Sequence, residues 1–524
     1  MTVDVQKLPR DVEQLKSLVI EMNKTIGFLQ EELRLARNWR YGRTADAVED
    51  QKQARLFNEA EDGAAEVAET EEAEQTVTVS AHERKKGGRR PLPANLPREE
   101  IVHDISEAEK VCACGARLSR IGEEISEQLE IIPARAKVIR HIRPKYACRA
   151  CQGVETENGA VKIAPPAEQL LPKSIATPGL LAYLMVSKFA DSLPFYRQER
   201  IFARLGVELS RATMCSWAME IAERLAPILE LMRARIRAGP YVQIDETRLR
   251  VLEDVGSTSQ MWVYRGGDPL SPTVVYAYHP SRSGDVPYEF LDGYRGWVQT
   301  DGYRGYEKLG RCDGVVLLGC WAHARRKFVE VTKTAAGGSA AHEALEYIRQ
   351  LYAVESQAES RGLDWDQLAA QRSQLSVPVL KEFRLWLDHL QEQTPPQGLL
   401  GRAIAYTVGQ WDRLERYVEH GMLRPDNNLA ENAIRPFVVG RKNWLFSATS
   451  RGAAASAALY SVIESAKANG HEPYWYLRFL FDGLVRARTE AELSVLLPQN
   501  VDPKALIPAG RYGAVPRART IRWL

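Results

Sequence analysis

The chain has 524 residues, of which 45% are hydrophobic and 26% are charged, and its formal net charge is +2. This length predicts about three or four domains rather than one core. No apolar run approaches the roughly 20 residues of a membrane-spanning helix. No apolar segment typical of a secretory signal follows the polar N-terminus, so we expect a cytoplasmic protein without membrane association. Seven cysteines, an odd number, argue against a disulfide framework.

Residues 1–43 predict a coiled-coil helix. Apolar residues recur at alternating steps of three and four, at Val12, Leu15, Val19, Met22, Ile26, Leu29 and Leu33. This spacing keeps one stripe facing a partner helix, so it favours a homo-oligomer. The alternative is a single amphipathic helix packed on its own domain, and Gly27 weakens the coiled-coil pattern.

Residues 44–98 predict a flexible linker. Between Thr44 and Ser80 there are eleven acidic and two basic residues, so this part contributes −9 and the rest of the chain carries +11. A basic run, RKKGGRRP, follows at residues 84–91. A basic body fits a polyanionic partner such as DNA, although a solvated tether explains the linker equally well.

Residues 99–165 predict a small zinc-binding module. Two closely spaced cysteine pairs, Cys112 with Cys114 and Cys148 with Cys151, flank a β-rich stretch. Four thiolates in two such pairs can surround one structural Zn²⁺ ion tetrahedrally. The first pair is one residue tighter than the common spacing, and two unrelated pairs of buried thiols are the alternative.

Residues 166–236 predict a helix-turn-helix DNA-binding domain. Segments 180–189 and 196–205 have helical spacing, a glycine-containing turn follows, and Ser210 suits the N-cap of a further helix. The second helix of such a pair enters the DNA major groove, and its first residues contact bases. The candidate contacts are Arg211, Thr213 and Ser216. Plain helical packing is the competing interpretation.

Residues 237–485 predict the catalytic domain. Short β-type runs occur at 241–252, 261–264, 273–278, 297–300 and 315–320, and a short helix is expected at 286–291. Three strands, a helix, a strand, then helix and strand is the order expected of a ribonuclease-H-like α/β core. The stretch from about 332 to 410 is mostly helical in pattern, and residues 486–524 are expected to form a C-terminal tail.

Three carboxylates in this region suit phosphodiester chemistry. Asp245 lies within the first strand, Asp301 at the end of the fourth, and Glu431 in a helix that begins after Pro425. Strand interiors disfavour aspartate, so an aspartate in an apolar run needs a reason. Mg²⁺ prefers carboxylate oxygens, and two ions about 4 Å apart can activate the attacking oxygen and stabilise the leaving one. Mn²⁺ is an alternative ion.

Each carboxylate also has a structural explanation. Asp245 could form a strand-edge salt bridge to Arg248 or Arg250, Asp301 a turn before glycine, and Glu431 a capping box with Asn428. The residues that could replace one of the three are Glu246, Asp254 and Asp426.

Five longer motifs resemble the large, TnpC-type transposases of insertion-sequence family 66. They are YVQIDET (241–247), QTDGYRGY (299–306), CWAHARRKF (320–328), NNLAENAIRP (427–436) and RKNWLF (441–446). The resemblance covers nearly the whole chain. It implies that Asp245, Asp301 and Glu431 are a DDE triad, that a helical insertion interrupts the core, and that small accessory proteins are encoded alongside.

Basic residues around these motifs are candidate DNA contacts. After the glutamate, Arg435, Arg441, Lys442 and Arg451 suit backbone phosphates. His323 and Arg325 are candidates for the scissile phosphate, although a lone histidine is more often structural.

The sequence therefore predicts a DNA transposase that binds the ends of an insertion sequence, cleaves a strand and joins the freed 3′-hydroxyl to target DNA. No phosphate-binding glycine loop is found, so ATP is not expected. The rival hypotheses are a structure-specific nuclease on the same core and a non-catalytic, zinc-containing DNA-binding regulator.

Overall fold

The computed structural model describes residues 136–147, 161–254, 259–333 and 339–506, with eight single positions between residues 11 and 29. The predicted linker, residues 44–98, lies outside this part. So do the predicted zinc ligands Cys112, Cys114, Cys148 and Cys151. None of the helices that the structure describes is long and apolar enough to cross a membrane.

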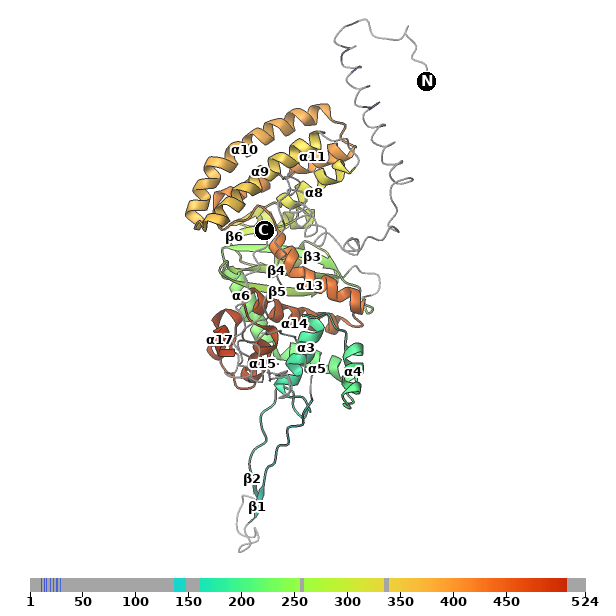
Figure 1. Cartoon of the computed structure of the whole chain (residues 1–524), viewed down its shortest axis with the longest axis vertical. Coiled ribbons are helices and arrows are strands. Elements are labelled where there is room, and N and C mark those ends of the chain that lie inside the picture. Colours follow the sequence, from blue (N-terminus) through green and yellow to red (C-terminus); the bar gives the residue numbers. More distant parts are fainter. Residues whose placement is uncertain are drawn as a thin grey trace, which may run out of the picture.

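A five-stranded mixed sheet forms the centre of the described chain (Figure 1). Its strands, in the order β5-β4-β3-β6-β7, are β5 (Ser271–His279), β4 (Gln260–Asp268), β3 (Tyr241–Arg248), β6 (Gly296–Gln299) and β7 (Val315–Leu318). The pairs β3–β4 and β4–β5 are antiparallel, whereas β3–β6 and β6–β7 are parallel. All five predicted strands are confirmed, although the predicted 241–252 strand ends earlier, at Arg248.

Two short helices connect the strands on one side of the sheet. Helix α7 (Asp285–Phe290) precedes β6, and the 3₁₀ helix η3 (Arg304–Arg311) lies between β6 and β7. Tyr264 of β4 stacks on Phe290 of α7, with ring centroids 3.6 Å apart. The predicted succession of three strands, a helix, a strand, a helix and a strand is confirmed, with the second helix of the 3₁₀ type.

The opposite side of the sheet packs against C-terminal helices. Helix α13 (Asn428–Trp444) packs on β3 and β4, and α14 (Ser450–Ala468) packs along β5. Helix α15 (Pro473–Leu484) follows and packs against α14. Along the edge strand β5, Ser461 Oγ and Ser465 Oγ accept hydrogen bonds from the backbone N–H groups of Tyr276 (2.7 Å) and Val274 (2.8 Å). These serines satisfy backbone donors that an edge strand otherwise exposes.

Four helices precede the sheet. They are α3 (Pro178–Phe189), α4 (Phe195–Arg204), α5 (Arg211–Arg224) and α6 (Ala226–Ala238). Gly206, in the turn before α5, has φ +76°, a conformation that glycine adopts without strain. Ser210 caps α5 by accepting a hydrogen bond from Thr213 N, as predicted. The helices pack into the same core as the sheet, through Met214 and Trp217 among others.

A second helical body stands at the other end of the sheet, at the top of Figure 1. It consists of α8 (Trp321–Thr332), α9 (Ala340–Arg361), α10 (Trp365–Gln393), α11 (Leu399–Gly409), α12 (Trp411–Leu414) and the 3₁₀ helix η4 (Glu415–Glu419). It has its own core, in which Trp321 contacts Phe383 and Trp411. The helical character predicted for residues 332–410 is confirmed for the described part.

Three further segments complete the described chain. Strands β1 (Lys145–Ala147) and β2 (Val161–Ile163) form an antiparallel hairpin that projects away from the sheet (Figure 1). The short helices α16 (Glu490–Val495), η5 (Pro498–Asn500) and α17 (Pro503–Leu506) return to the main core. In the N-terminal region, the described positions Val19, Met22, Ile26 and Leu29 are helical and exposed, so this apolar stripe is open to a partner helix.

Candidate active site

Asp245 lies on the central strand and faces the C-terminal helices. It pairs with Val263, which in turn pairs with Tyr276, so the three residues share one face of the sheet. The Tyr276 hydroxyl donates to the carbonyl oxygen of Ala433 in α13, which places α13 on this face. Glu431 therefore approaches Asp245 from the first turn of α13.

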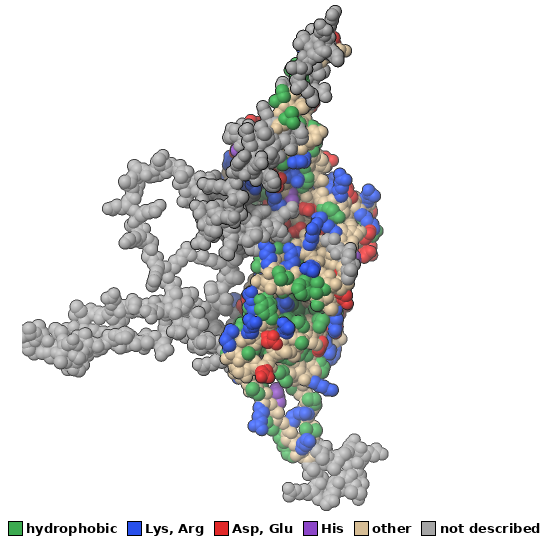
Figure 2. All heavy atoms as spheres, turned by 90° about the vertical axis from the view of Figure 1, so that its right-hand side faces the viewer, with side chains coloured by type: hydrophobic (Ala, Val, Ile, Leu, Met, Phe, Trp, Pro, Cys, Tyr) green, Lys and Arg blue, Asp and Glu red, His purple; other side chains and the backbone are tan. Residues whose placement is uncertain are grey.

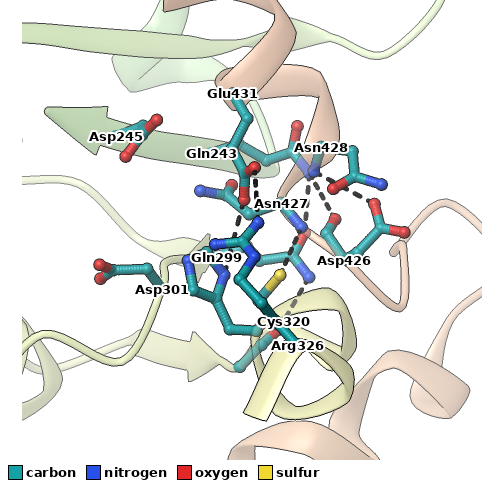
Figure 3. Close-up of polar contacts among 12 residues, drawn as sticks. Gln243, Asp245, Gln299, Asp301, Cys320, Arg326, Asp426, Asn427, Asn428 and Glu431 are labelled. Atoms are coloured by element: carbon teal, nitrogen blue, oxygen red, sulfur yellow. Dashed lines mark hydrogen bonds and ion pairs between the residues drawn. The ribbon is translucent and has the colours of Figure 1, made fainter. Parts of the chain in front are cut away.

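Asp301 and Glu431 come from opposite sides of the same region (Figure 3). Asp301 lies two residues after the end of β6, and its Oδ1 accepts a hydrogen bond from Tyr303 N at 2.8 Å. The predicted turn before glycine is thus present, with Gly302 at φ +86°. Glu431 is 95% buried. The capping-box alternative for Glu431 is wrong, because the N-cap of α13 is Asn427 and no side chain caps the helix.

A buried amide network joins the strands beneath these carboxylates. Gln243 and Gln299 occupy paired positions of β3 and β6, and Gln243 Nε2 donates to Gln299 Oε1 at 2.8 Å. Tyr241 donates its hydroxyl to the same Gln299 oxygen. Gln299 Nε2 then donates to the carbonyl oxygens of Gly319 and Arg424, both at 2.9 Å. The network therefore holds the segment around Arg424, which precedes α13.

The residues just before α13 extend this network (Figure 3). Gln243 Nε2 donates to the Asp426 carbonyl oxygen at 3.0 Å, and Asn427 Nδ2 donates to the Ile244 carbonyl oxygen at 2.9 Å. Asp426 itself accepts from Tyr352 Oη at 2.8 Å and from Asn428 N at 3.1 Å. The start of α13 is therefore held by β3 on one side and by the helical body on the other.

The pKa of the Asp245 carboxyl is strongly perturbed. Burial, followed by the charges of Glu431, Glu246 and Asp301, raises its pKa well above the usual value, and His323 opposes this shift. Carboxylates from three distant segments therefore lie close enough for their charges to raise the pKa of Asp245. Mutual repulsion of this kind is relieved by a bound cation, so the cluster is a candidate metal site.

The alternative carboxylates have structural partners. Glu246 points to the opposite face, where Arg282 Nε (2.8 Å) and the Tyr306 hydroxyl donate to it. Burial and then Asp301 raise the pKa of Glu246, and these two hydrogen bonds oppose the shift. Asp254 accepts from Ser259, Tyr278 and Ser450, away from the cluster. Among the described residues, Asp245 forms no ion pair with Arg248 or Arg250.

Helix α8 contributes a polar face next to Glu431. His323 Nδ1 lies 3.5 Å from Glu431 Oε1, and Arg326 Nη2 lies 3.7 Å from Glu431 Oε2. Cys320, immediately before α8, accepts a hydrogen bond from Asn427 N to its Sγ at 3.2 Å. Arg325, also on α8, is half-buried. Of the two predicted contacts on α8, His323 lies beside Glu431 of the triad.

The other predicted DNA contacts lie on helices α13, α14 and α5. Arg435, Arg441 and Lys442 follow Glu431 along α13, and Arg441 Nη1 donates to Thr247 Oγ1 at 3.1 Å. Arg451 pairs with Glu223 at 2.6 Å, with both side chains exposed. On α5, Arg211 and Ser216 are exposed, and Thr213 is half-buried. Figure 2 shows Lys and Arg side chains along one face of the described chain, with hydrophobic side chains between them.

Matches to family models cover most of the chain. The model described as "Transposase IS66 family" matches residues 173–455, and the "IS66 C-terminal element" matches 461–499. The "zinc-finger binding domain of transposase IS66" matches 109–152, which includes the four cysteines of the predicted zinc module. The "Transposase C of IS166 homeodomain" matches 28–101.

Relatives of similar length support the same assignment. The uncharacterized protein y4jD of Sinorhizobium fredii is 33% identical over 518 residues, covering 95% of this chain and 98% of y4jD. The uncharacterized protein y4qI of the same organism is 30% identical over 519 residues, covering 95% and 93% of the two chains. The architecture and the matches define a transposase. The chain belongs to the IS66 family of transposases.

Proposed function

We propose that this transposase uses Asp245, Asp301 and Glu431 as a DDE triad on a ribonuclease-H-like core. The sheet order β5-β4-β3-β6-β7, with two antiparallel and two parallel strand pairs, supports this core. The observation that carries the proposal is the raised pKa of Asp245, which has Glu431 and Asp301 among its causes. The charges of Asp301 and Glu431, which lie 56 and 186 residues from Asp245 in sequence, both act on it here.

The residues present fit magnesium. Their donors are hard carboxylate oxygens, which Mg²⁺ and Mn²⁺ prefer. Asp245 of β3, Asp301 after β6 and Glu431 of α13 would hold the ion. When bound, magnesium supplies Lewis-acid activation of the attacking oxygen and stabilises the leaving oxygen.

The remaining residues hold and orient the substrate. The Gln243–Gln299 network keeps β3, β6 and the start of α13 in register, so the three carboxylates stay together. His323 and Arg325 on α8 face the scissile phosphate, with Arg326 beside Glu431. Arg435, Arg441, Lys442 and Arg451 contact the DNA backbone, which neutralises phosphate charge without reading sequence.

Binding of the element ends is assigned to the helix-turn-helix formed by α4 and α5. Arg211 and Ser216 are exposed at the start of α5, where such helices contact bases. The zinc finger supplies a structural Zn²⁺ site, and the exposed N-terminal stripe supports a homo-oligomer that holds two ends together. Small accessory proteins are further partners in this proposal.

A joining assay separates this proposal from its rivals. Full-length protein is incubated with Mg²⁺, labelled DNA carrying the element's ends and a supercoiled target plasmid. A transposase yields labelled ends covalently attached to the target. Cleavage without joining would favour the structure-specific nuclease, and end binding without cleavage would favour the non-catalytic DNA-binding regulator.

Magnesium should stabilise the fold through the same cluster. Ligand binding at ten times its Kd adds about 1.4 kcal/mol to the free energy of unfolding. We expect Mg²⁺ to raise the Tm of the wild type and to have a smaller effect on Asp245→Asn. Without Mg²⁺, Asp245→Asn should melt at a higher temperature than the wild type, because it removes a charge repelled by Glu431 and Asp301. Differential scanning fluorimetry checks both. Equal Mg²⁺ responses would remove Asp245 from the metal site.

A further inference from the structure

Cys320, His323 and Glu431 bring three different metal-binding groups together. A thiol sulfur, an imidazole nitrogen and a carboxylate oxygen all lie within 4.8 Å of one another. We propose that these residues form a second, thiolate-containing site for Zn²⁺, which shares Glu431 with the magnesium cluster. No family description assigns a metal to this position, because the zinc-finger match ends at residue 152.

The start of α8 and the start of α13 bring the three groups together. Cys320 is the N-cap residue of α8, and His323 follows within the first turn, so both face the start of α13. The hydrogen bond from Asn427 N to Cys320 Sγ fixes the sulfur. The thiolate is the form of a cysteine side chain that binds metals.

The two oxygens of Glu431 have different neighbours. Oε1 faces His323, whereas Oε2 faces Arg326. A metal bound between Cys320, His323 and Oε1 would leave the contact between Arg326 and Oε2 in place. His323 would bind through Nδ1 as the neutral imidazole, with its proton on Nε2.

The donor set selects zinc over magnesium. Thiolate and imidazole are ligands of Zn²⁺ and similar transition metals, whereas Mg²⁺ takes oxygen ligands. At tetrahedral zinc bond lengths, neighbouring ligand atoms lie about 3.3–3.8 Å apart. Ligand atoms that now lie within 4.8 Å of one another would therefore move closer by at most about 1–1.5 Å on binding. Three protein ligands leave the fourth position to water.

Sharing Glu431 makes the site inhibitory. This consequence rests on the proposed function, in which Glu431 is a magnesium ligand. A zinc ion held by Cys320 and His323 draws Glu431 Oε1 towards α8, so the carboxylate is withdrawn from Asp245. Zinc and catalytic magnesium then compete for one side chain, and free zinc holds the enzyme inactive.

Metal binding is tested directly with Co²⁺, whose bond to a thiolate gives a charge-transfer band. Full-length wild type holding one equivalent of Zn²⁺ per chain, for the zinc finger, is titrated with Co²⁺ alone. It is compared with Cys320→Ser and with Cys215→Ser, which removes an exposed cysteine of α5. Any contribution of the zinc finger is common to all three proteins. We expect Cys215→Ser to match the wild type and Cys320→Ser to lose the band of one thiolate. Equal bands in wild type and Cys320→Ser would overturn the site.

His323→Gln provides a second test that keeps the thiol. Loss of this ligand should weaken Co²⁺ binding by at least the roughly ten- to hundred-fold that loss of an outer-shell partner costs. Unchanged affinity in His323→Gln would equally overturn the site. Circular dichroism melts confirm that the compared variants are folded.

Inhibition is measured separately, as the ratio of end cleavage with and without ZnCl₂ at fixed Mg²⁺. Zinc should inhibit the wild type and Cys215→Ser equally, and Cys320→Ser should need at least about ten-fold more zinc. A thiolate band that depends on Cys320, in a protein without Mg²⁺-dependent cleavage, would refute the proposed function and leave the metal site standing. Mg²⁺-dependent cleavage without a Cys320-dependent band would refute the metal site and leave the proposed function standing.

Discussion

Replacing Asp245 by Asn, Asp301 by Asn or Glu431 by Gln should each reduce Mg²⁺-dependent end cleavage and joining by roughly a thousand-fold or more. Metal-ion catalysis contributes several kcal/mol of charge stabilisation, and each 1.4 kcal/mol corresponds to a factor of ten in rate. Each substitution keeps the size of the side chain but removes the charge that holds the cation. The measurement is single-turnover cleavage of labelled element ends.

Binding and a matched control separate a catalytic defect from misfolding. All three variants should bind end DNA like the wild type, because the proposed end-binding residues Arg211 and Ser216 lie elsewhere, on α5. Asp313→Asn removes an exposed carboxylate that pairs with Arg295 at 2.9 Å, and it should cleave at the wild-type rate. A triad variant that still cleaves normally would show that its carboxylate has another role.

The elements that position the triad could be predicted from local patterns. The β-type runs predict the five strands of the sheet, because alternating and apolar segments bounded by turns are typical of buried strands. Asp245 was conspicuous because aspartate is unfavourable in a strand interior. Ser210 was recognised as an N-cap from its position before a helical pattern.

The contacts that bring the carboxylates together could not be predicted in this way. Gln243 and Gln299 are 56 residues apart, and a glutamine in a strand carries no signal that it meets another glutamine. Their pairing depends on the parallel register of β3 and β6, which no local period determines. The hydrogen bond from Asn427 N to the sulfur of Cys320 joins residues 107 apart in sequence, and no local pattern predicts it either.

The sequence pattern also could not predict which charged residues of the helices are buried. Arg372 lies in the long helix α10, where an arginine normally indicates a solvent-exposed face. The structure instead buries it, with 1% of its side chain exposed. Its burial follows from the packing of α9 and of the 415–423 segment around it, which is a tertiary property. Glu355, seventeen residues earlier, supplies the compensating charge, and only the antiparallel arrangement of α9 and α10 brings the two together.

Arg372→Ala is expected to destabilise the helical body by about 3–5 kcal/mol, the usual effect of removing one partner from a buried ion pair. Arg372 Nε and Nη2 bind both oxygens of Glu355 at 2.8 and 2.7 Å. Its guanidinium also donates to the carbonyl oxygens of Tyr417, His420 and Leu423, at 2.7–2.8 Å. Loss of the arginine leaves these acceptors buried without a donor, and urea unfolding measures the change.

The effect should extend to the active site, because Leu423 leads directly to Arg424 and Asp426, which the Gln243–Gln299 network holds. We therefore expect Arg372→Ala to reduce end cleavage as well as stability, even at temperatures where the protein remains folded. The matched control is Arg384→Ala on the same helix. Arg384 forms a partly exposed pair with Asp388 at 3.0 Å, and such pairs contribute only about 0–1 kcal/mol. If the two variants unfold at the same urea concentration, Arg372 does not anchor the segment that carries Glu431.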